Sequence, residues 1–227
     1  MNVIVSNIIR HQVEKESKKF IVPHFPGGVL TPEALRKMAD ACEAFPEARL
    51  KISGELMIGG ITDSRRNDAC REKLGLPTFS IAGPSVRPVK ACAGGYICDN
   101  NVQDTFALSL KLDKLFAGRP LPFKMIIAVS GCGRNCSEPR VRDIGVVAQK
   151  NGYVVFAGGA AGGKPRIARE IATVPDDEQV VVLVEKIIQF YAANGRTMER
   201  LGAVIERLGM DTFCKACGLS PVPDRTA

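Results

Sequence analysis

Residues 125–136, with the sequence MIIAVSGCGRNC, place two cysteines directly after an apolar run that is typical of a buried strand. An earlier pair lies upstream, and the two spacings are Cys92-x5-Cys98 and Cys132-x3-Cys136. Four thiolates that two short loops bring together suit a cubane iron–sulfur cluster, because each iron needs one soft anionic ligand. The pattern therefore favours an iron–sulfur cluster held by these four cysteines.

Two other interpretations of the cysteines stay open on spacing alone. Structural zinc loops usually have about two to four residues between paired cysteines, so the five-residue spacing fits zinc poorly. The compact four-cysteine run of a bacterial ferredoxin is also absent from the sequence. A zinc site and unliganded core thiols are therefore the alternatives to a cluster.

The composition is that of an ordinary globular protein, with 45% hydrophobic and 24% charged residues among 227. No apolar run approaches the roughly 20 residues that a membrane-spanning helix needs, and the first residues do not read as a signal peptide. We therefore predict a cytoplasmic protein without membrane association, whose eight cysteines are reduced thiols or metal ligands. The formal charge of +7 suits anionic ligands, but the 6% aromatic content and the lack of Trp argue against nucleic acid.

The order of apolar and polar residues predicts an α+β fold. Strands are expected at 20–23, 50–58, 124–129, 144–148 and 153–157. Helices are expected at 32–45, 64–74, 102–116, 176–193 and 197–208. Residues 77–91, rich in Pro, Gly and Ser, are expected to form a linker or an extended crossing segment. The apolar face of the first helix is predicted to carry Leu35, Met38, Ala39 and Cys42.

The residues around the cysteines resemble those of the nitrite and sulfite reductase family. The resemblance rests on the segments 92–98, 102–104, 128–138, 143–146 and 158–166. In these segments the chain is similar to small assimilatory-type sulfite reductases and to the large subunit of assimilatory nitrite reductase. The resemblance covers about residues 15–212. It implies a ferredoxin-like half-domain over 1–80, then a sirohaem and 4Fe-4S domain with C-terminal helices over 81–227.

The resemblance also implies roles for individual residues. In this family the four cysteines hold a 4Fe-4S cluster, and the fourth, here Cys136, also bridges to the sirohaem iron. Arg87 and Lys124 match positions that contact substrate or sirohaem, so both are candidate catalytic and cofactor-binding residues. Sirohaem carries many carboxylates, which favours Arg and Lys around it. Further candidate cofactor contacts are Arg134, Asn135, Lys164 and Arg166.

The implied activity is the six-electron reduction of sulfite to sulfide or of nitrite to ammonia. Both substrates are small oxyanions, and the resemblance does not choose between them. No Rossmann fingerprint for a nicotinamide or flavin is present, so we expect an external electron-donor protein. Larger relatives carry two copies of this unit around a pseudo-twofold axis, so a homodimer is expected by analogy.

Three positions depart from the family pattern and keep other functions open. Pro122 replaces one lysine of a Lys-x-Lys pair, while Ser53 and Glu55 stand where arginines are found. A carboxylate facing an anionic substrate would repel it, unless Arg65 or Arg66 supplies the missing charge.

The first alternative function is an electron carrier with a 4Fe-4S cluster and no sirohaem. The second is a basic binding module stabilised by zinc or by thiols, motivated by the pI of about 9.1 and by Cys214-x2-Cys217. The two histidines, His11 and His24, have no ligand-like spacing and are expected to be ordinary surface residues.

Overall fold

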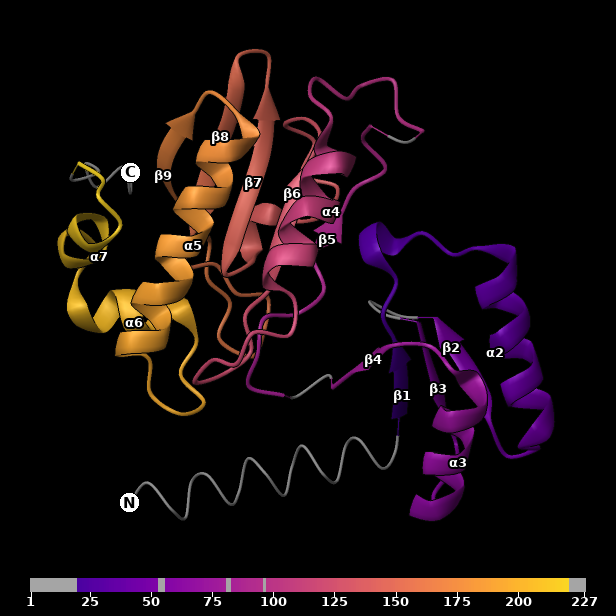
Figure 1. The fold of residues 1–227 in the computed structure, drawn as a ribbon. Coiled ribbons are helices and arrows are strands. Elements are labelled where there is room, and N and C mark those ends of the chain that lie inside the picture. Colours follow the sequence, from indigo (N-terminus) through magenta and orange to yellow (C-terminus); the bar gives the residue numbers. More distant parts are fainter. Residues whose placement is uncertain (1–19, 53–55, 81–82, 96, 221–227) are drawn as a thin grey trace. The chain divides into compact units, whose positions relative to one another are not determined.

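The computed structural model describes residues 20–52, 56–80, 83–95 and 97–220. The chain forms two compact units, Met1–Gly83 and Pro84–Ala227. Each unit has its own sheet and its own helices, as Figure 1 shows. The predicted α+β class is therefore confirmed. Within the described part of the chain, no helix combines the length and the apolar character that crossing a membrane requires.

The first unit is built on a four-stranded antiparallel sheet in the order β2-β3-β1-β4. Its strands are β1 (Phe20–Pro23), β2 (Arg49–Ile52), β3 (Leu56–Gly59) and β4 (Thr78–Phe79). The helical elements of this unit are η1 (Pro26–Gly28), α2 (Pro32–Ala44) and α3 (Ser64–Leu74). Both α-helices contribute to one apolar core with the sheet, whose members include Ile21, Met38, Ile58 and Cys70.

Two details of this unit differ from the sequence-based expectation. The single strand predicted over 50–58 is wrong, because β2 and β3 pair antiparallel with Ile52 opposite Leu56. Helix α2 begins as predicted, where the Thr31 hydroxyl accepts a hydrogen bond from the Ala34 amide at 3.1 Å. Its buried face is Ala34, Met38 and Ala41, however, and Leu35 is 50% exposed.

The second unit contains a five-stranded mixed sheet in the order β5-β6-β7-β8-β9. Strands β5, β6 and β7 run parallel, and β7, β8 and β9 run antiparallel. The strands are β5 (Lys90–Ala91), β6 (Ile127–Ser130), β7 (Ile144–Gln149), β8 (Gly152–Ala157) and β9 (Arg169–Val174). The helices are α4 (Thr105–Phe116), η2 (Pro139–Val141), α5 (Asp177–Asn194), α6 (Leu201–Leu208) and α7 (Met210–Ala216).

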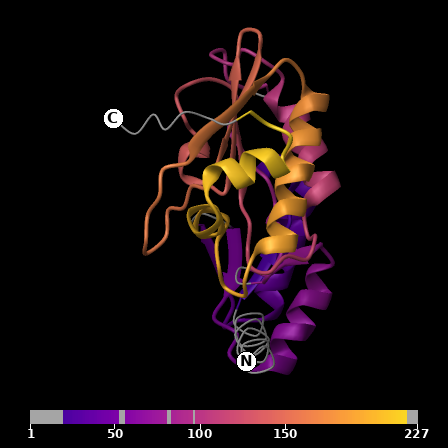
Figure 2. The same ribbon diagram turned by 90° about the vertical axis from the view of Figure 1, so that its left-hand side faces the viewer.

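Helices α4 and α5 lie along one face of this sheet (Figure 2). The main core lies beneath them and joins side chains such as Leu112 and Ile187 to Val129 and Val155. Helix α4 connects the segment after β5 to the segment before β6. This is the crossover that parallel neighbours require, and it returns the chain to the same edge of the sheet.

The hairpin predicted at 144–157 is confirmed as β7 and β8, which turn at Lys150 and Asn151, with Gly152 as the first residue of β8. The segment predicted to be a linker contains two short strands, β4 and β5, so it contributes to both sheets. Besides these two strands, β9, α7 and the short helices η1 and η2 were not predicted. The helix expected from residue 102 begins at Thr105, because the Asp104 carboxylate caps it by accepting from the Ala107 amide at 3.0 Å.

A buried ion pair fixes the start of β7 to the C-terminal helices. Asp143 is fully buried and accepts hydrogen bonds from Arg200 Nε at 2.9 Å and from Nη2 at 2.6 Å. The same carboxylate accepts from the Ile126 amide at 2.8 Å, just before β6. One side chain therefore holds together the entry to β6, the entry to β7 and the N-terminus of α6.

We predict that Asp143→Asn destabilises the protein strongly. Removing one charge from a buried, hydrogen-bonded ion pair costs about 3–5 kcal/mol, because the other charge stays without its partner. The free energy of unfolding in urea measures the loss. Glu206→Gln is the matched control, since Glu206 also forms a two-bond pair with Arg166 but is 61% exposed. That variant should lose at most about 1 kcal/mol; equal losses in the two variants would contradict the prediction.

Candidate metal centre

The four cysteines singled out in the sequence line a single cavity of about 100 Å³. The cavity lies where two neighbouring parallel strands end, because β5 runs directly into Cys92 and β6 into the loop with Cys132. Cys92, Cys98 and Cys132 are partly buried, whereas Cys136 is exposed. The structure therefore brings together residues from two loops that 33 residues separate in the sequence.

Hydrogen bonds between the two cysteine loops hold them side by side. The Cys92 amide donates to the Val129 carbonyl at 3.1 Å, and the Val102 amide donates to the Gly131 carbonyl at 3.0 Å. Two further amides donate to the Cys92 sulfur, Gly94 N at 3.3 Å and Gly131 N at 3.1 Å. Such N–H donors stabilise negative charge on a ligating sulfur.

The cavity requires glycine at two positions. A Cβ atom on Gly94 would lie 2.6 Å from Asn101 Oδ1, and a Cβ atom on Gly131 would overlap the same oxygen. Neither position accepts a side chain unless Asn101 or the loops shift. The cavity therefore needs glycine at these two positions because no side chain fits there.

A pair of serines supports the second cysteine loop from inside. Ser130 Oγ and Ser137 Oγ are 2.7 Å apart, and the Ser137 hydroxyl also donates to the Val129 carbonyl at 2.7 Å. Both serines are buried. They lie just before Cys132 and just after Cys136, so they clamp the two ends of the loop. Neither serine was a candidate in the sequence, since nothing in their spacing distinguishes them from ordinary loop serines.

The predicted cofactor contacts lie in different surroundings. Arg134 lines the cysteine cavity together with Cys136. The Asn135 side chain is used inside the loop, where its Oδ1 accepts from the Arg140 amide at 3.2 Å. Arg166 lines a separate groove of about 850 Å³ beside β9 and α6, and its guanidinium binds Glu206 at 2.7 and 2.8 Å. Arg166 is thus already paired.

The remaining predicted basic residues differ in burial. Arg87 is only 6% exposed, and its amide donates to the Met125 carbonyl at 2.8 Å beside the start of the sheet. Lys124 is half-buried, with its Nζ 5.7 Å from the centre of the Phe123 ring. Lys164 is exposed. Of these, Arg87 is the one that the fold holds in a low-dielectric position, where its charge acts most strongly.

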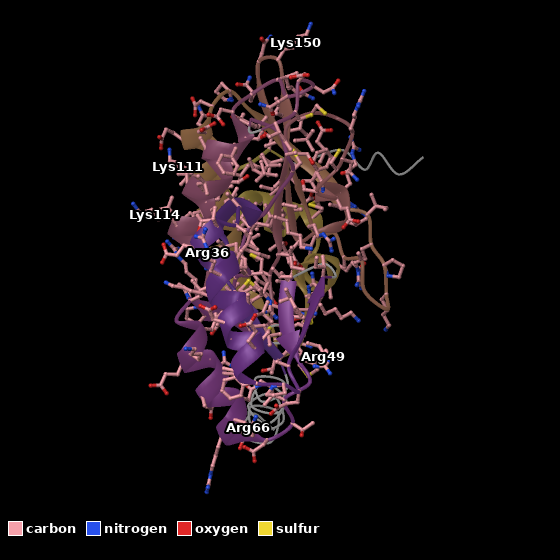
Figure 3. The ribbon with its side chains drawn as sticks, turned by 90° about the vertical axis from the view of Figure 1, so that its right-hand side faces the viewer. Arg36, Arg49, Arg66, Lys111, Lys114 and Lys150 are labelled. Carbon is pink, nitrogen blue, oxygen red and sulfur yellow. The ribbon has the colours of Figure 1, made fainter. Side chains whose placement is uncertain are left out.

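Part of the positive charge lies on side chains that do not line the cysteine cavity. Figure 3 shows Lys111 and Lys114 projecting from α4 and Lys150 at the tip of the β7–β8 hairpin. In the first unit, the Arg66 guanidinium pairs with Glu47 at 2.5 and 2.9 Å. Arg66 is therefore engaged in its own unit, while Ser53 and Glu55 lie outside the described residues, as does His11.

The Cys214-x2-Cys217 pair is part of the apolar core. Both thiols are fully buried and pack with Phe213 and α5. Burial raises the pKa of Cys217 to about 12, so this thiol stays protonated and is a poor metal ligand or redox nucleophile. Among the described residues, no three His, Cys, Asp or Glu side chains converge on a point where one metal ion could bind.

These features define the class of protein. The protein is of the α+β class and has a centre of four thiols. Two adjacent parallel strands of its mixed sheet each end in a cysteine loop, and a separate unit contains an antiparallel sheet. Residues 82–222 match the nitrite and sulphite reductase 4Fe-4S domain. This match covers more than half of the chain, and the chain therefore belongs to that family. Membership supports an iron–sulfur cluster as its cofactor.

Individual relatives agree with this assignment. The chain is 31% identical over 208 residues to a nitrite reductase [NAD(P)H] of Bacillus subtilis, covering 91% of this chain and 26% of that protein. It is 28% identical over 197 residues to an assimilatory-type sulfite reductase of Nitratidesulfovibrio vulgaris, covering 86% of this chain and 90% of the relative. The chain thus spans about a quarter of the Bacillus protein.

A solved structure shows the same fold. Dissimilatory sulfite reductase I superposes with a TM-score of 0.75 at 14% identity, covering 92% of this chain and 71% of that one. At this identity the likeness concerns the fold alone.

We predict that Gly131→Ala prevents the site from holding its cofactor. The added methyl group overlaps the Asn101 side chain, which must leave its place between the two cysteine loops. Iron and acid-labile sulfide per chain, measured on anaerobically purified protein, should fall to a small fraction of the wild-type content. Gly133→Ala is the matched control in the same loop, because nothing lies within 4 Å of its added Cβ; cofactor loss in both variants would refute the steric explanation.

Proposed function

We propose that this protein is an oxidoreductase that uses a 4Fe-4S cluster and sirohaem to reduce sulfite or nitrite by six electrons. The observation that carries the proposal is that the four cysteines of the family domain line one cavity and that Cys136 is exposed at it. Electrons come from an external donor protein. The cytoplasmic location and the homodimer expected from the sequence belong to the same proposal.

The described residues fit a cluster better than a single zinc ion. Two loops present the four thiols around a small cavity, and backbone amides point at the Cys92 sulfur. In a cubane cluster each thiolate binds a different iron, which suits four thiols that surround one cavity. The alternative of a binding module stabilised by zinc or thiols is also weakened, because Cys214 and Cys217, on which it rested, belong to the core.

Cys136 is the thiol best placed to contact a second group. It is the exposed member of the four, and we therefore assign the contact with a neighbour outside the cavity to this residue. When bound, sirohaem supplies the iron that holds the oxyanion and receives electrons from the cluster. Arg134 borders Cys136 and offers positive charge to carboxylates or to the substrate. Arg87 adds a charge that is held in place by burial.

One observation favours the carrier without sirohaem as a second candidate. Arg166, proposed to bind sirohaem carboxylates, forms two hydrogen bonds with Glu206. Arg66, which was expected to replace missing substrate-binding charge, is bound by Glu47 in the same way. Two candidate anion ligands are thus occupied by the protein's own carboxylates. An electron carrier needs neither of them.

The visible spectrum of anaerobically purified protein, combined with iron and acid-labile sulfide counts, separates the candidates. A Soret band with an isobacteriochlorin band in the red and about four sulfides per chain supports the reductase. Cluster absorption without tetrapyrrole bands supports the carrier. A colourless protein overturns both. Turnover with a reduced viologen dye, tested separately on sulfite and nitrite, then identifies the substrate.

We predict that Cys136→Ser abolishes the electronic coupling between cluster and sirohaem, because serine replaces the soft thiolate that the two centres share. Electron paramagnetic resonance and Mössbauer spectra of the holoprotein measure this coupling. Cys42→Ser is the matched control, since Cys42 is a partly buried thiol of the other unit and should leave the spectra unchanged. Wild-type coupling in Cys136→Ser would disprove the bridging role.

A further inference from the structure

Two polar side chains behind the cysteine cavity touch both cysteine loops. Asn101 lies between Cys98 and α4 and lines the cavity, and Thr105 is the first residue of α4 and is buried. Neither was a candidate site residue in the sequence. They are linked to each other, because the Thr105 hydroxyl is 3.1 Å from Asn101 Oδ1. Together they form a short polar bracket, which we call the Asn101–Thr105 bracket.

The bracket contacts one glycine in each loop. The Thr105 hydroxyl is 3.4 Å from the Gly94 carbonyl oxygen in the first loop. The space beside Gly94 and Gly131 is filled by the same two groups, Asn101 Oδ1 and Thr105 Oγ1. The Asn101 amide group is itself fixed, because its Nδ2 donates to the Gln103 carbonyl. The bracket therefore sets how closely the backbones of the two loops approach.

These two glycines are also the residues whose amides donate to the Cys92 sulfur, Gly94 at 3.3 Å and Gly131 at 3.1 Å. One donor comes from each loop, and both converge on one sulfur. A change in the position of either glycine changes an N–H···S distance. The bracket and the two donors are thus parts of one arrangement.

We propose that Asn101 and Thr105 are positioning residues that hold the Gly94 and Gly131 amides on the Cys92 sulfur and thereby set the reduction potential of the cluster. The inference rests on the proposed function, since it requires that Cys92 ligates a cluster. Hydrogen bonds to ligating sulfurs stabilise the more negative, reduced form and raise the potential. Loosening the bracket therefore makes the cluster harder to reduce.

Thr105→Val tests the bracket in the holoprotein, because valine keeps the shape of threonine and removes its hydroxyl. We expect the reduction potential, measured by redox titration followed by electron paramagnetic resonance, to become more negative in Thr105→Val and in Asn101→Ala. Thr105→Ser restores the hydroxyl and should restore the potential. If the two residues act as one unit, the double variant should shift the potential by less than the sum of the single shifts.

Hydrogen exchange of the peptides that contain Gly94 and Gly131 gives a readout that does not depend on the cluster. Exchange should be faster in Thr105→Val and Asn101→Ala than in the wild type, with or without cofactor. Ser109→Ala is the matched control on the same helix: its buried hydroxyl donates to the Thr105 carbonyl at 2.6 Å. It should leave exchange and potential unchanged, which separates the bracket from general destabilisation of α4.

The outcomes distinguish the bracket from the proposed function. A wild-type protein that takes up no cluster overturns the proposed function, and the bracket's effect on potential falls with it. If the wild type carries a cluster and Thr105→Val and Asn101→Ala have the same reduction potential as the wild type, the proposed role of the bracket is wrong while the proposed function stands. Unchanged glycine exchange in both variants overturns it as well. A potential shift of equal size in Ser109→Ala would show that the effect is not specific to these two residues.

Discussion

The structure of the candidate site depends on the parallel pairing of β5 and β6. Ala91 lies opposite Val129, so the residues that follow each strand leave the sheet at the same edge. This register is what brings the Cys92 loop beside the Cys132 loop, and the α4 crossover makes a parallel arrangement possible. A shift of one residue would turn Ile127 and Val129 away from the core that they share with α4 and α5.

Several of the charged side chains of the protein are paired with each other and do not face the cysteine cavity. The deepest ion pair, Asp143 with Arg200, joins strand entries to the C-terminal helices and serves the fold. More exposed arginines such as Arg66 and Arg166 are paired with carboxylates of the same unit. The positive net charge therefore does not translate directly into an anion-binding site. The cysteine cavity is built by backbone and thiols, and Arg134 is the cationic side chain that lines it.

Short sequence signals predicted the elements whose ends are fixed by particular residues. Examples are α2, which Thr31 caps, and the β7–β8 hairpin, which turns just before Gly152. The alternation of apolar and polar residues over 50–58 led to the wrong prediction of one strand. Apolar residues recur at every second position both in one long strand and in two strands that pair with each other. The four cysteines were predicted from their spacing. Asn101 was not predicted, because its contact with Gly131 joins residues far apart in the sequence, and no local pattern reveals such a contact.

The two cysteine loops are not equivalent, and this asymmetry bears on how two cofactors could share one site. Cys92 lies on the closed side, where both loops direct amides at its sulfur and a buried threonine stands behind them. Cys136 lies on the open side, exposed and beside Arg134. Donors on one thiolate withdraw charge from it, whereas an exposed thiolate keeps its lone pairs for a second partner. The open side of the site therefore presents an exposed cysteine beside Arg134, where the proposed bridge to sirohaem would need one.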